Sequence, residues 1–370
     1  SPLFEDLYLR KGLDQSMDRL IEALSEASGA HFDLYTMLPH RFAGTINGYA
    51  YTTGSFKMSG EAVWEILKVY ARISRFFKMP EFDWDRVVLP GYQRLIARWE
   101  AIDLAEATDE SLLRGISEMA AADSTYWFGS ALNLGLSRML DPAFDWLLRS
   151  PLIRYALPEP HPVGASFLRG FDSKALDAQA DMEALADNIR HSAEMRELVL
   201  KTDTPKVIEA LAKHPDAQSV LEDIQHYLNT YGHQIYNLDF ADPTQNEEPT
   251  PILLSLKALV KNAPERDVRS RQAQMAAERD ALVARTRQGL NPLSQKLFDW
   301  VWKWIKQYAP YREDIMFYMG AAWPTLRTLA HELGQRLTDS GAITKPDDIY
   351  YLDSAEITAA SEARANGQNM

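Results

Sequence analysis

The stretch DESLLRGISEMAAADSTYWFGSALNLGLSRML, residues 109–140, decides the fold class. Apolar residues recur in it three and four positions apart, as at Leu112 and Ile116, and this spacing places them on one face of an α-helix. Thr108 precedes the stretch and is placed to cap it, and the two acidic residues that follow favour a helix N-terminus. The stretch therefore predicts a long amphipathic helix.

The same periodicity extends over most of the chain, and strand signals are sparse. β-Forming residues flank the Asn47–Gly48 pair within residues 45–51 and predict a small hairpin, while the residues after Pro346 predict a short extended piece over Asp348–Leu352. The sequence thus predicts an all-α fold, a large multi-helix domain with one or two small β elements. Helices are expected over Leu13–Ala27, Gly60–Phe77, Tyr92–Ala105, Asp109–Leu140, Ala175–Leu200, Pro205–Ala212, Ala217–Tyr231, Ile252–Leu259, Asp267–Leu290, Ser294–Tyr308 and Glu313–Leu337.

We expect one helical domain over residues 1–355, followed at 356–370 by a tail or linker, since large apolar residues are missing after Ala359. The segment Asp239–Pro251 is rich in proline and acidic residues and predicts a long loop, whose length suggests a function or a cover over a site. The segment Arg266–Arg279 is charged on most faces and predicts a long exposed helix arm, either solvated or recognising a partner.

Composition excludes several classes of function. The formal net charge of -13 argues against nucleic acid as a partner, because binding to phosphates relies on Lys and Arg. The absence of cysteine excludes disulfides, thiolate metal ligands and a cysteine nucleophile. No stretch reaches the roughly 18 consecutive apolar residues of a spanning helix, and the first residues do not read as a signal peptide, so we expect a cytoplasmic protein without a membrane partner. No phosphate-binding loop, dinucleotide fingerprint or nucleophile elbow is present.

His233 is the most distinctive of the eight histidines. A helix is expected to end near Tyr231, with Gly232 in the left-handed conformation that closes it. Polar side chains gather after this helix end and predict a site wall, or else they satisfy backbone groups of a buried loop. These side chains are His233, Gln234, Tyr236, Asn237 and Asp239.

His331 begins a sequence that resembles half of a zinc-binding helix, but position 335 is glutamine, so we expect no metal site.

Two arginines belong to the helix expected around Glu313–Leu337. At about 100° per residue, Arg312 falls inside its apolar stripe and Arg327 falls at the edge. An unpaired buried charge costs several kcal/mol, so each guanidinium needs an anionic partner, which is either a carboxylate of the chain or a phosphate. Pro324 is expected to kink this helix near Gly320.

Four stretches, in this order, resemble the central domain of phosphoenolpyruvate-synthase-like phosphotransferases, a group that includes rifampin phosphotransferase and phenylphosphate synthase. In many members the third stretch reads Tyr, Gly, His, Arg, Gly and an acidic residue. Gln234 and Ile235 replace the Arg and Gly here, and the segment looks nearer to the phenylphosphate synthase branch. The stretches are SPLFEDLYLRKGLDQSM (1–17), HRFAGTINGYAYTT (40–53), YGHQIYNLDFADPTQNEEPTPILLSL (231–256) and REDIMFYMGAAWPTLRTLAHELGQRLTDSGAITKPDDIYYL (312–352).

The resemblance implies a division of labour. In this family an ATP-grasp module phosphorylates a histidine on a small swivelling domain, which carries the phosphoryl group to an acceptor held by the central domain. The carrier histidine follows Thr, Ser or Cys, and no histidine of this chain does. The resemblance therefore implies an acceptor-binding part that is inactive alone, with no cofactor of its own. ATP and Mg²⁺ are expected on the partner module, and the ATP-grasp module and phosphohistidine domain are the expected partners.

The resemblance also implies roles for individual residues. His233 is expected to act as base or orienter toward the hydroxyl of a small, aromatic acceptor such as a phenol, and Arg312 or Arg327 to neutralise the arriving phosphoryl group. Trp323 and other aromatic side chains would wall the acceptor. The alternatives are an ATP-dependent ligase of the same architecture and a non-catalytic helical binding or scaffold protein, for which the charged arm from Arg266 is the best argument.

Overall fold

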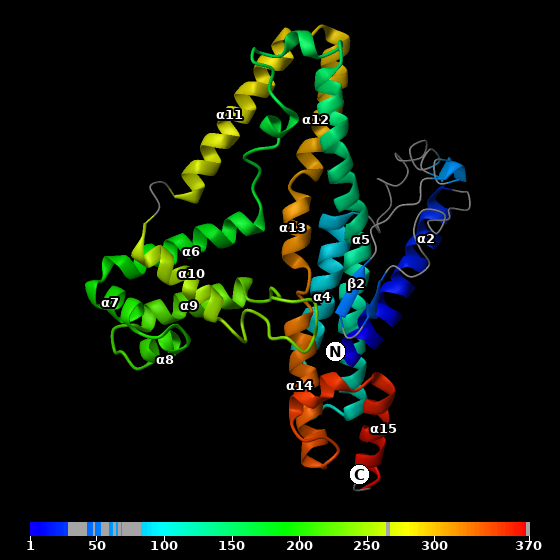
Figure 1. Cartoon of the computed structure of the whole chain (residues 1–370), viewed down its shortest axis with the longest axis vertical. Coiled ribbons are helices and arrows are strands. Elements are labelled where there is room, and N and C mark those ends of the chain that lie inside the picture. The colour runs from blue at the N-terminus through cyan, green and yellow to red at the C-terminus, as the bar shows by residue number, and fades with distance from the viewer. Residues whose placement is uncertain are drawn as a thin grey trace. The chain divides into compact units, whose positions relative to one another are not determined.

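The computed structural model describes residues 1–28, 43–46, 49–52, 59–61, 64–65, 68, 83–263 and 267–367. The described residues are mostly helical, which confirms the predicted all-α class (Figure 1). Their one sheet is an antiparallel hairpin of β1 (Ala43–Ile46) and β2 (Tyr49–Thr52). The predicted hairpin is confirmed, while its turn and most of the helix predicted over 60–77 lie outside the described residues. No helix in the described part of the chain is long and apolar enough to cross a membrane.

The chain divides into two compact units. Unit 1 contains Ser1–Leu132, Ile235–Thr244 and Met319–Met370, and unit 2 contains Asn133–Gln234 and Gln245–Tyr318. Helix α5 (Asp109–Arg149) contributes its first part to unit 1 and the remainder to unit 2. The predicted boundary between a domain ending at residue 355 and a tail stays a prediction.

Unit 1 is organised around buried aromatic rings. Trp323 is fully buried, and its ring lies 4.9 Å from that of Phe240, 6.0 Å from Phe4 and 6.1 Å from Tyr8. Phe240 belongs to the predicted acidic loop, so this part of the loop is core. The helices described in unit 1 are α1 (Pro2–Phe4), the π-helix η1 (Glu5–Leu13), α2 (Asp14–Ser28), the π-helix η4 (Trp84–Val88), α4 (Leu89–Glu100), the first part of α5, α14 (Trp323–Asp339), the 3₁₀ helix η8 (Pro346–Tyr351) and α15 (Ser354–Ala365).

A buried carboxyl group joins several elements of unit 1. Oδ1 of Asp123 on α5 accepts hydrogen bonds from the Tyr92 hydroxyl and from the Gly320 amide, the latter at 2.8 Å. Tyr8 and Trp323 also face this carboxyl without a hydrogen bond, and Oδ2 has no partner among the residues that the structure describes. Burial raises the pKa of Asp123, and these neighbouring donors oppose the shift only in part.

Near the C-terminal end one prediction is wrong and another stays a prediction. The extended piece predicted over Asp348–Leu352 is the 3₁₀ helix η8, because Pro346 starts its first turn and the Asp348 carboxylate accepts the amides of Thr344 and Lys345. Helix α15 continues past Ala359 as far as Ala365, and the tail or linker expected over 356–370 stays a prediction. Asp353 caps this helix, and Ile357 is fully buried.

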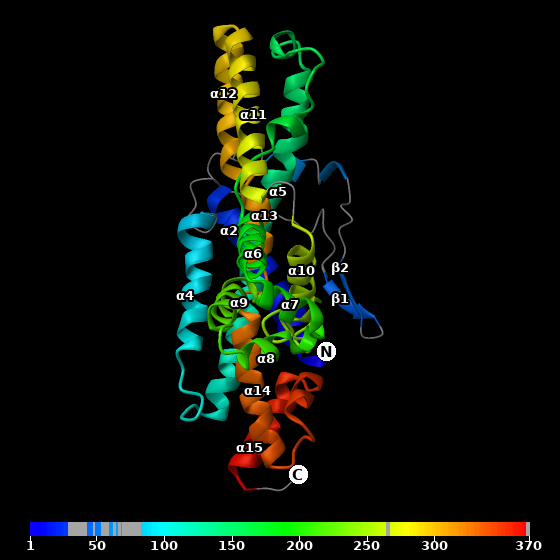
Figure 2. The same ribbon diagram turned by 90° about the vertical axis from the view of Figure 1, so that its left-hand side faces the viewer.

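Unit 2 contains two hydrophobic clusters. One is formed by α6 (Lys174–His191), α7 (Ala193–Lys201), α8 (Val207–Ala212), α9 (Gln218–Tyr231) and α10 (Thr250–Lys261), which gather in Figure 1 and Figure 2. The other joins the end of α5 to α11 (Val268–Gly289) and α12 (Pro292–Tyr308). The unit also has the 3₁₀ helices η5 (Arg154–Ala156), η6 (Gly164–Phe167) and η7 (Thr204–Lys206), and α13 (Tyr311–Tyr318).

Several predicted helix boundaries differ from the structure. Helix α5 continues past Pro142, because Phe144, Leu147 and Leu148 on its last turns pack into the second cluster. The helix predicted over 175–200 is broken at Ser192, whose hydroxyl caps α7. The helix predicted over 313–337 is not kinked but divided into α13 and α14. Gly320 takes the left-handed conformation between them, with φ of 81°.

The charged helix α11 is present, but it is not a free arm. Arg269 pairs with Asp177, Arg271 with Glu183, and Arg279 donates to the carbonyl oxygen of Gly170 at 2.8 Å. Val268 and Gln272 on the same helix are buried. Because these arginines are bonded within unit 2, the strongest sequence feature in favour of a scaffold protein has a structural role.

Candidate functional site

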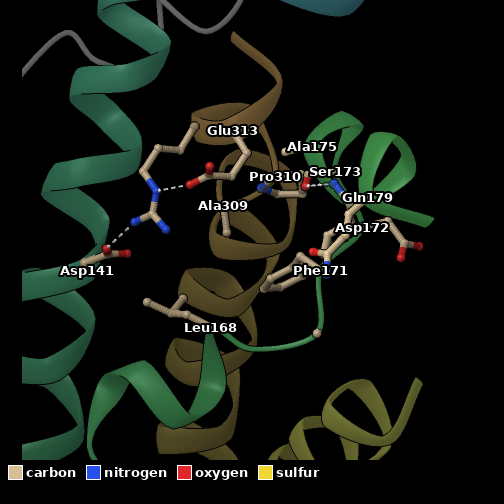
Figure 3. Close-up of a pocket in the computed structure, with 13 residues that line it drawn as sticks. Asp141, Leu168, Phe171, Asp172, Ser173, Ala175, Gln179, Ala309, Pro310 and Glu313 are labelled. Carbon is tan, nitrogen blue, oxygen red and sulfur yellow. Dashed lines mark hydrogen bonds and ion pairs between the residues drawn. The ribbon is translucent and has the colours of Figure 1, made fainter. Parts of the chain in front are cut away.

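A cavity of about 320 Å³ lies in unit 2 where three parts of the chain meet (Figure 3). Asp141 on α5 forms one side, and the loop from Leu168 to Ser173 with the first turns of α6 forms the other. The connection from α12 to α13 contributes Ala309, Pro310, Arg312 and Glu313. Carbon walls and charged groups therefore face the same space, as in many small-molecule sites.

Arg312, a residue predicted for phosphate neutralisation, lines this cavity. Its Nε atom lies 3.1 Å from Oε1 of Glu313, and Nη1 lies 3.6 Å from Oδ2 of Asp141. The side chain is 47% exposed, so the prediction that it lies in the apolar stripe is wrong, and of the two predicted kinds of partner the structure contains carboxylates. Two carboxylates thus orient a guanidinium that stays accessible from the cavity.

Asp141 is the cavity carboxyl with a perturbed pKa. Burial raises this pKa, and the positive charge of Arg312 acts in the opposite direction. A carboxylate whose pKa is raised holds a proton more strongly than an exposed one. Asp141 can therefore accept a proton from a bound hydroxyl more readily than an ordinary surface aspartate.

The loop on the other side of the cavity is held tightly. Gly170 has a φ of 71°, and an added Cβ would lie 2.3 Å from the backbone nitrogen of Ala276, so a larger residue cannot replace it without a shift. The guanidinium of Arg279 lies over the Phe171 ring at 4.4 Å. Ser173 caps α6 by accepting the amide of Leu176. The cavity wall is therefore preformed.

His233 lies in unit 2 but outside the lining of this cavity. Its Nε2 atom is 2.8 Å from the carbonyl oxygen of Phe317, which can only accept, so Nε2 carries the proton of this hydrogen bond. The ring also packs against Phe317 and Tyr318. Burial lowers the pKa of His233, and the carbonyls of Phe317 and Thr230 oppose the shift. The lowered pKa favours the neutral imidazole, and the ring ties the end of α9 to α13.

The expected left-handed conformation of Gly232 is wrong, since its φ is −74°. Glycine is needed there for another reason: an added Cβ would lie 2.3 Å from the carbonyl oxygen of Leu228 and 2.9 Å from Cβ of Asn246. Gln234 follows, and its carbonyl accepts the amide of Gln245 at 3.0 Å. The helix end is thus closed by packing and by backbone pairing with the returning loop.

The other predicted site residues belong to unit 1. Tyr236 and Asn237 are exposed, and Asp239 accepts the Ser1 hydroxyl at 2.6 Å and the Ala241 amide at 2.9 Å. Trp323 is buried in the aromatic core described above. Arg327 donates to the carbonyl of Phe240 and lies 5.1 Å from the centre of the Tyr350 ring. Of the predicted site residues, Arg312 is the one that lines the unit 2 cavity.

Sequence reasoning missed Asp141, Glu313 and the loop around Phe171. Ser173 directly before a helical pattern is a capping signal that could have marked the start of α6 beside the cavity. Asp141 has no local signal, because it directly precedes a proline, where a helix is expected to end. Its position opposite Arg312 depends on the packing of α5 against distant parts of the sequence.

Comparisons with known proteins agree with the resemblance. Residues 147–313 match the family model of the rifampicin phosphotransferase fourth domain. The predicted resemblance to this group of phosphotransferases is thereby confirmed for that stretch, which contains the whole cavity lining except Asp141. The chain is also similar to the chondramide synthase of Chondromyces crocatus, with 23% identity over an alignment of 300 residues that covers 77% of this chain. The chain spans 7% of that protein's length.

Proposed function

We propose that this chain is the acceptor-binding part of a phosphotransferase, and that the unit 2 cavity holds a small hydroxyl-bearing molecule. The observation that carries the proposal is Arg312, an accessible guanidinium in a preformed cavity within a phosphotransferase-like stretch. A volume of about 320 Å³ is at the low end for ligand pockets and suits a molecule with one ring. Phe171 and Leu168 offer apolar surface for such a ring.

In the proposed reaction the acceptor oxygen attacks the phosphorus of a phosphohistidine on another domain or subunit. The oxygen–phosphorus bond forms while the nitrogen–phosphorus bond breaks. The hydroxyl proton passes first to the Asp141 carboxylate. It then passes to the imidazole nitrogen that has lost the phosphoryl group, so the carrier histidine becomes neutral again. Arg312 stabilises the charge on the transferred group, since catalysis of phosphoryl transfer is mainly positioning and charge stabilisation. ATP and Mg²⁺ act on the partner module that loads the carrier.

His233 remains a second proposed base or orienter. Its Nε2 proton is engaged by Phe317, so this role would fall to Nδ1. The two assignments are separated by comparing Asp141→Asn with His233→Ala in the assembled enzyme. Loss of transfer with only the first variant supports Asp141, and loss with only the second supports His233.

The proposal is tested by phosphoryl transfer from labelled ATP to a panel of phenols, with the ATP-grasp module and the phosphohistidine domain present. Arg312→Gln is expected to lower the transfer rate by about 100-fold, the usual effect of removing one charge-stabilising donor. Arg285→Gln is the matched control, because Arg285 is exposed and, within the described part of the chain, bonds to a backbone carbonyl of its own helix alone. Equal rates for Arg312→Gln and the control would rule the site out.

A second candidate is a ligase that uses phosphoryl transfer to join two small molecules. It is favoured by the similarity to a protein whose name describes a synthase. The same labelled reaction distinguishes the two, because a phosphotransferase leaves the label on the acceptor and a ligase releases it with a joined product.

A further inference from the structure

A second and larger cavity lies within unit 1 between α4 and α5, with a volume of about 580 Å³. The space exists because small side chains face it from both helices, namely Gly91, Ala121 and Ala122. A Cβ added at Gly91 would meet one atom of the described residues within 4 Å, Nη2 of Arg94 at 3.9 Å. The volume is in the range of small-molecule sites, roughly 300–1,000 Å³.

Two stacked phenol rings contribute a fixed wall. The rings of Tyr92 and Tyr126 are 4.6 Å apart and nearly parallel, and both side chains are buried. Their hydroxyls are engaged: Tyr126 accepts from the indole of Trp84 at 3.2 Å, and Tyr92 donates to Asp123 and accepts from the Ala322 amide. Rings held in this way lose little freedom when a ligand binds, and they favour a planar aromatic partner.

The charges at the cavity are not balanced. Arg98 is neutralised by Glu118, which also accepts the indole N–H of Trp99 at 2.9 Å. Arg19 on α2 lines the cavity, is exposed, and has no hydrogen bond or ion pair within the described part of the chain. Thr125 adds a hydroxyl whose one hydrogen bond among the described side chains, to Ser16, is long at 3.5 Å. The cavity therefore offers a free cation and a hydrogen-bonding hydroxyl beside an aromatic wall.

We propose that this cavity of unit 1 binds a planar aromatic carboxylate, with its ring against the Tyr92–Tyr126 stack and its carboxylate toward Arg19. The site is separate from the acceptor cavity of unit 2, and it does not depend on the proposed function. Guanidinium groups bind carboxylates through paired hydrogen bonds, which explains the preference for this anion.

The test is calorimetric titration of the full chain with 2-naphthoate, with its neutral analogue 2-naphthylmethanol and with acetate. We expect 2-naphthoate to bind, the neutral analogue to bind about three- to fivefold more weakly, as one exposed ion pair allows, and acetate not to bind. Absence of 2-naphthoate binding at millimolar concentration, or equal affinity for the neutral analogue, would overturn the proposal.

Two variants locate the site. Gly91→Leu adds a side chain on the cavity wall, where the first added atom, Cβ, would lie no closer than 3.9 Å to a described atom, and it should weaken 2-naphthoate binding at least tenfold. Ala97→Leu is its control on an exposed position of α4 outside the cavity lining, and should bind as the unchanged chain does. Arg19→Gln should reduce binding of 2-naphthoate to that of the neutral analogue. Undiminished binding by Gly91→Leu, with thermal melting showing a folded protein, would refute the site, as would equal losses in Gly91→Leu and Ala97→Leu.

Discussion

Asp141 and Asp123 are both shielded from water, but the groups around their carboxyls differ. Asp141 is half-buried beside the cation of Arg312, whereas Asp123 is fully buried and is faced by the phenols of Tyr8 and Tyr92, the indole of Trp323 and the amide of Gly320. Burial raises the pKa of both carboxyls. Only Asp141 has a neighbouring charge that favours ionisation, so it suits proton transfer, while Asp123 suits a role as a neutral hydrogen-bonding group.

The Asp141 proposal predicts a pH profile for phosphoryl transfer. A base must be unprotonated, so the rate should fall as pH drops through the pKa of Asp141, which lies above the usual aspartate value. Arg312→Gln removes the charge that lowers this pKa, so the acid limb should move to higher pH. The rate of the assembled enzyme is measured from pH 4 to 8. If the acid limb of the pH–rate profile is unchanged in Asp141→Asn, a group other than Asp141 is responsible for it.

Asp123 predicts a pH dependence of stability. Its pKa is raised in the folded state, so the contribution of this group to stability is complete below the unfolded pKa near 3.8 and is lost as pH rises toward the folded pKa. Asp123→Asn cannot ionise, and its stability relative to the unchanged chain should therefore increase from pH 4 to pH 7. Urea unfolding measures this difference. The control Asp347→Asn, at an exposed position, should show no such trend.

At the scale of elements, local periodicity was sufficient to predict most helices, because one buried face leaves a regular apolar spacing in the sequence. It failed where tertiary packing decides. Counting residues from one helix to the next placed Arg312 on the wrong face, because α13 ends at Tyr318, Gly320 is left-handed, and α14 begins only at Trp323. The unit 2 cavity depends on α5, α6 and α13 meeting, and this meeting has no local signature.

Two helical glycines should respond to alanine with opposite signs. A Cβ at Gly334 on α14 would lie 2.3 Å from the carbonyl oxygen of Pro346 in η8, so Gly334→Ala should destabilise the protein by about 1–3 kcal/mol. Gly91 on α4 has open space, so Gly91→Ala should stabilise it by about 0.5–1 kcal/mol through better helix propensity. Thermal unfolding with calorimetry checks both. If Gly334→Ala and Gly91→Ala change the stability equally, the close contact at Gly334 relaxes without a loss of stability.

At the scale of the whole molecule, the chain combines a phosphotransferase-like stretch with two cavities of different chemistry. The stretch that matches the fourth-domain model lies in unit 2, apart from Ile235–Thr244. The cavity in unit 2 has a paired arginine and a carboxyl suited to proton transfer, and the cavity in unit 1 has an arginine without a partner among the described residues, beside fixed aromatic rings. This difference fits an acceptor site for reaction in unit 2 and a binding site without proton transfer in unit 1.

The proposed division of labour predicts the behaviour of the isolated chain. Residues 1–370 contain no phosphate-binding loop and no histidine preceded by Ser, Thr or Cys, so ATP, Mg²⁺ and a phenol should give no phosphorylated product with this chain alone. Adding a separately phosphorylated carrier domain to the unchanged chain should give phosphoryl transfer to the phenol. With the Arg312→Gln chain the rate of this transfer should be about 100-fold lower. Product formation from ATP by the chain alone would contradict the absence of the donor modules. A phosphorylated carrier that loses its label only to water, although the chain binds the phenol, would contradict the acceptor role of unit 2 itself.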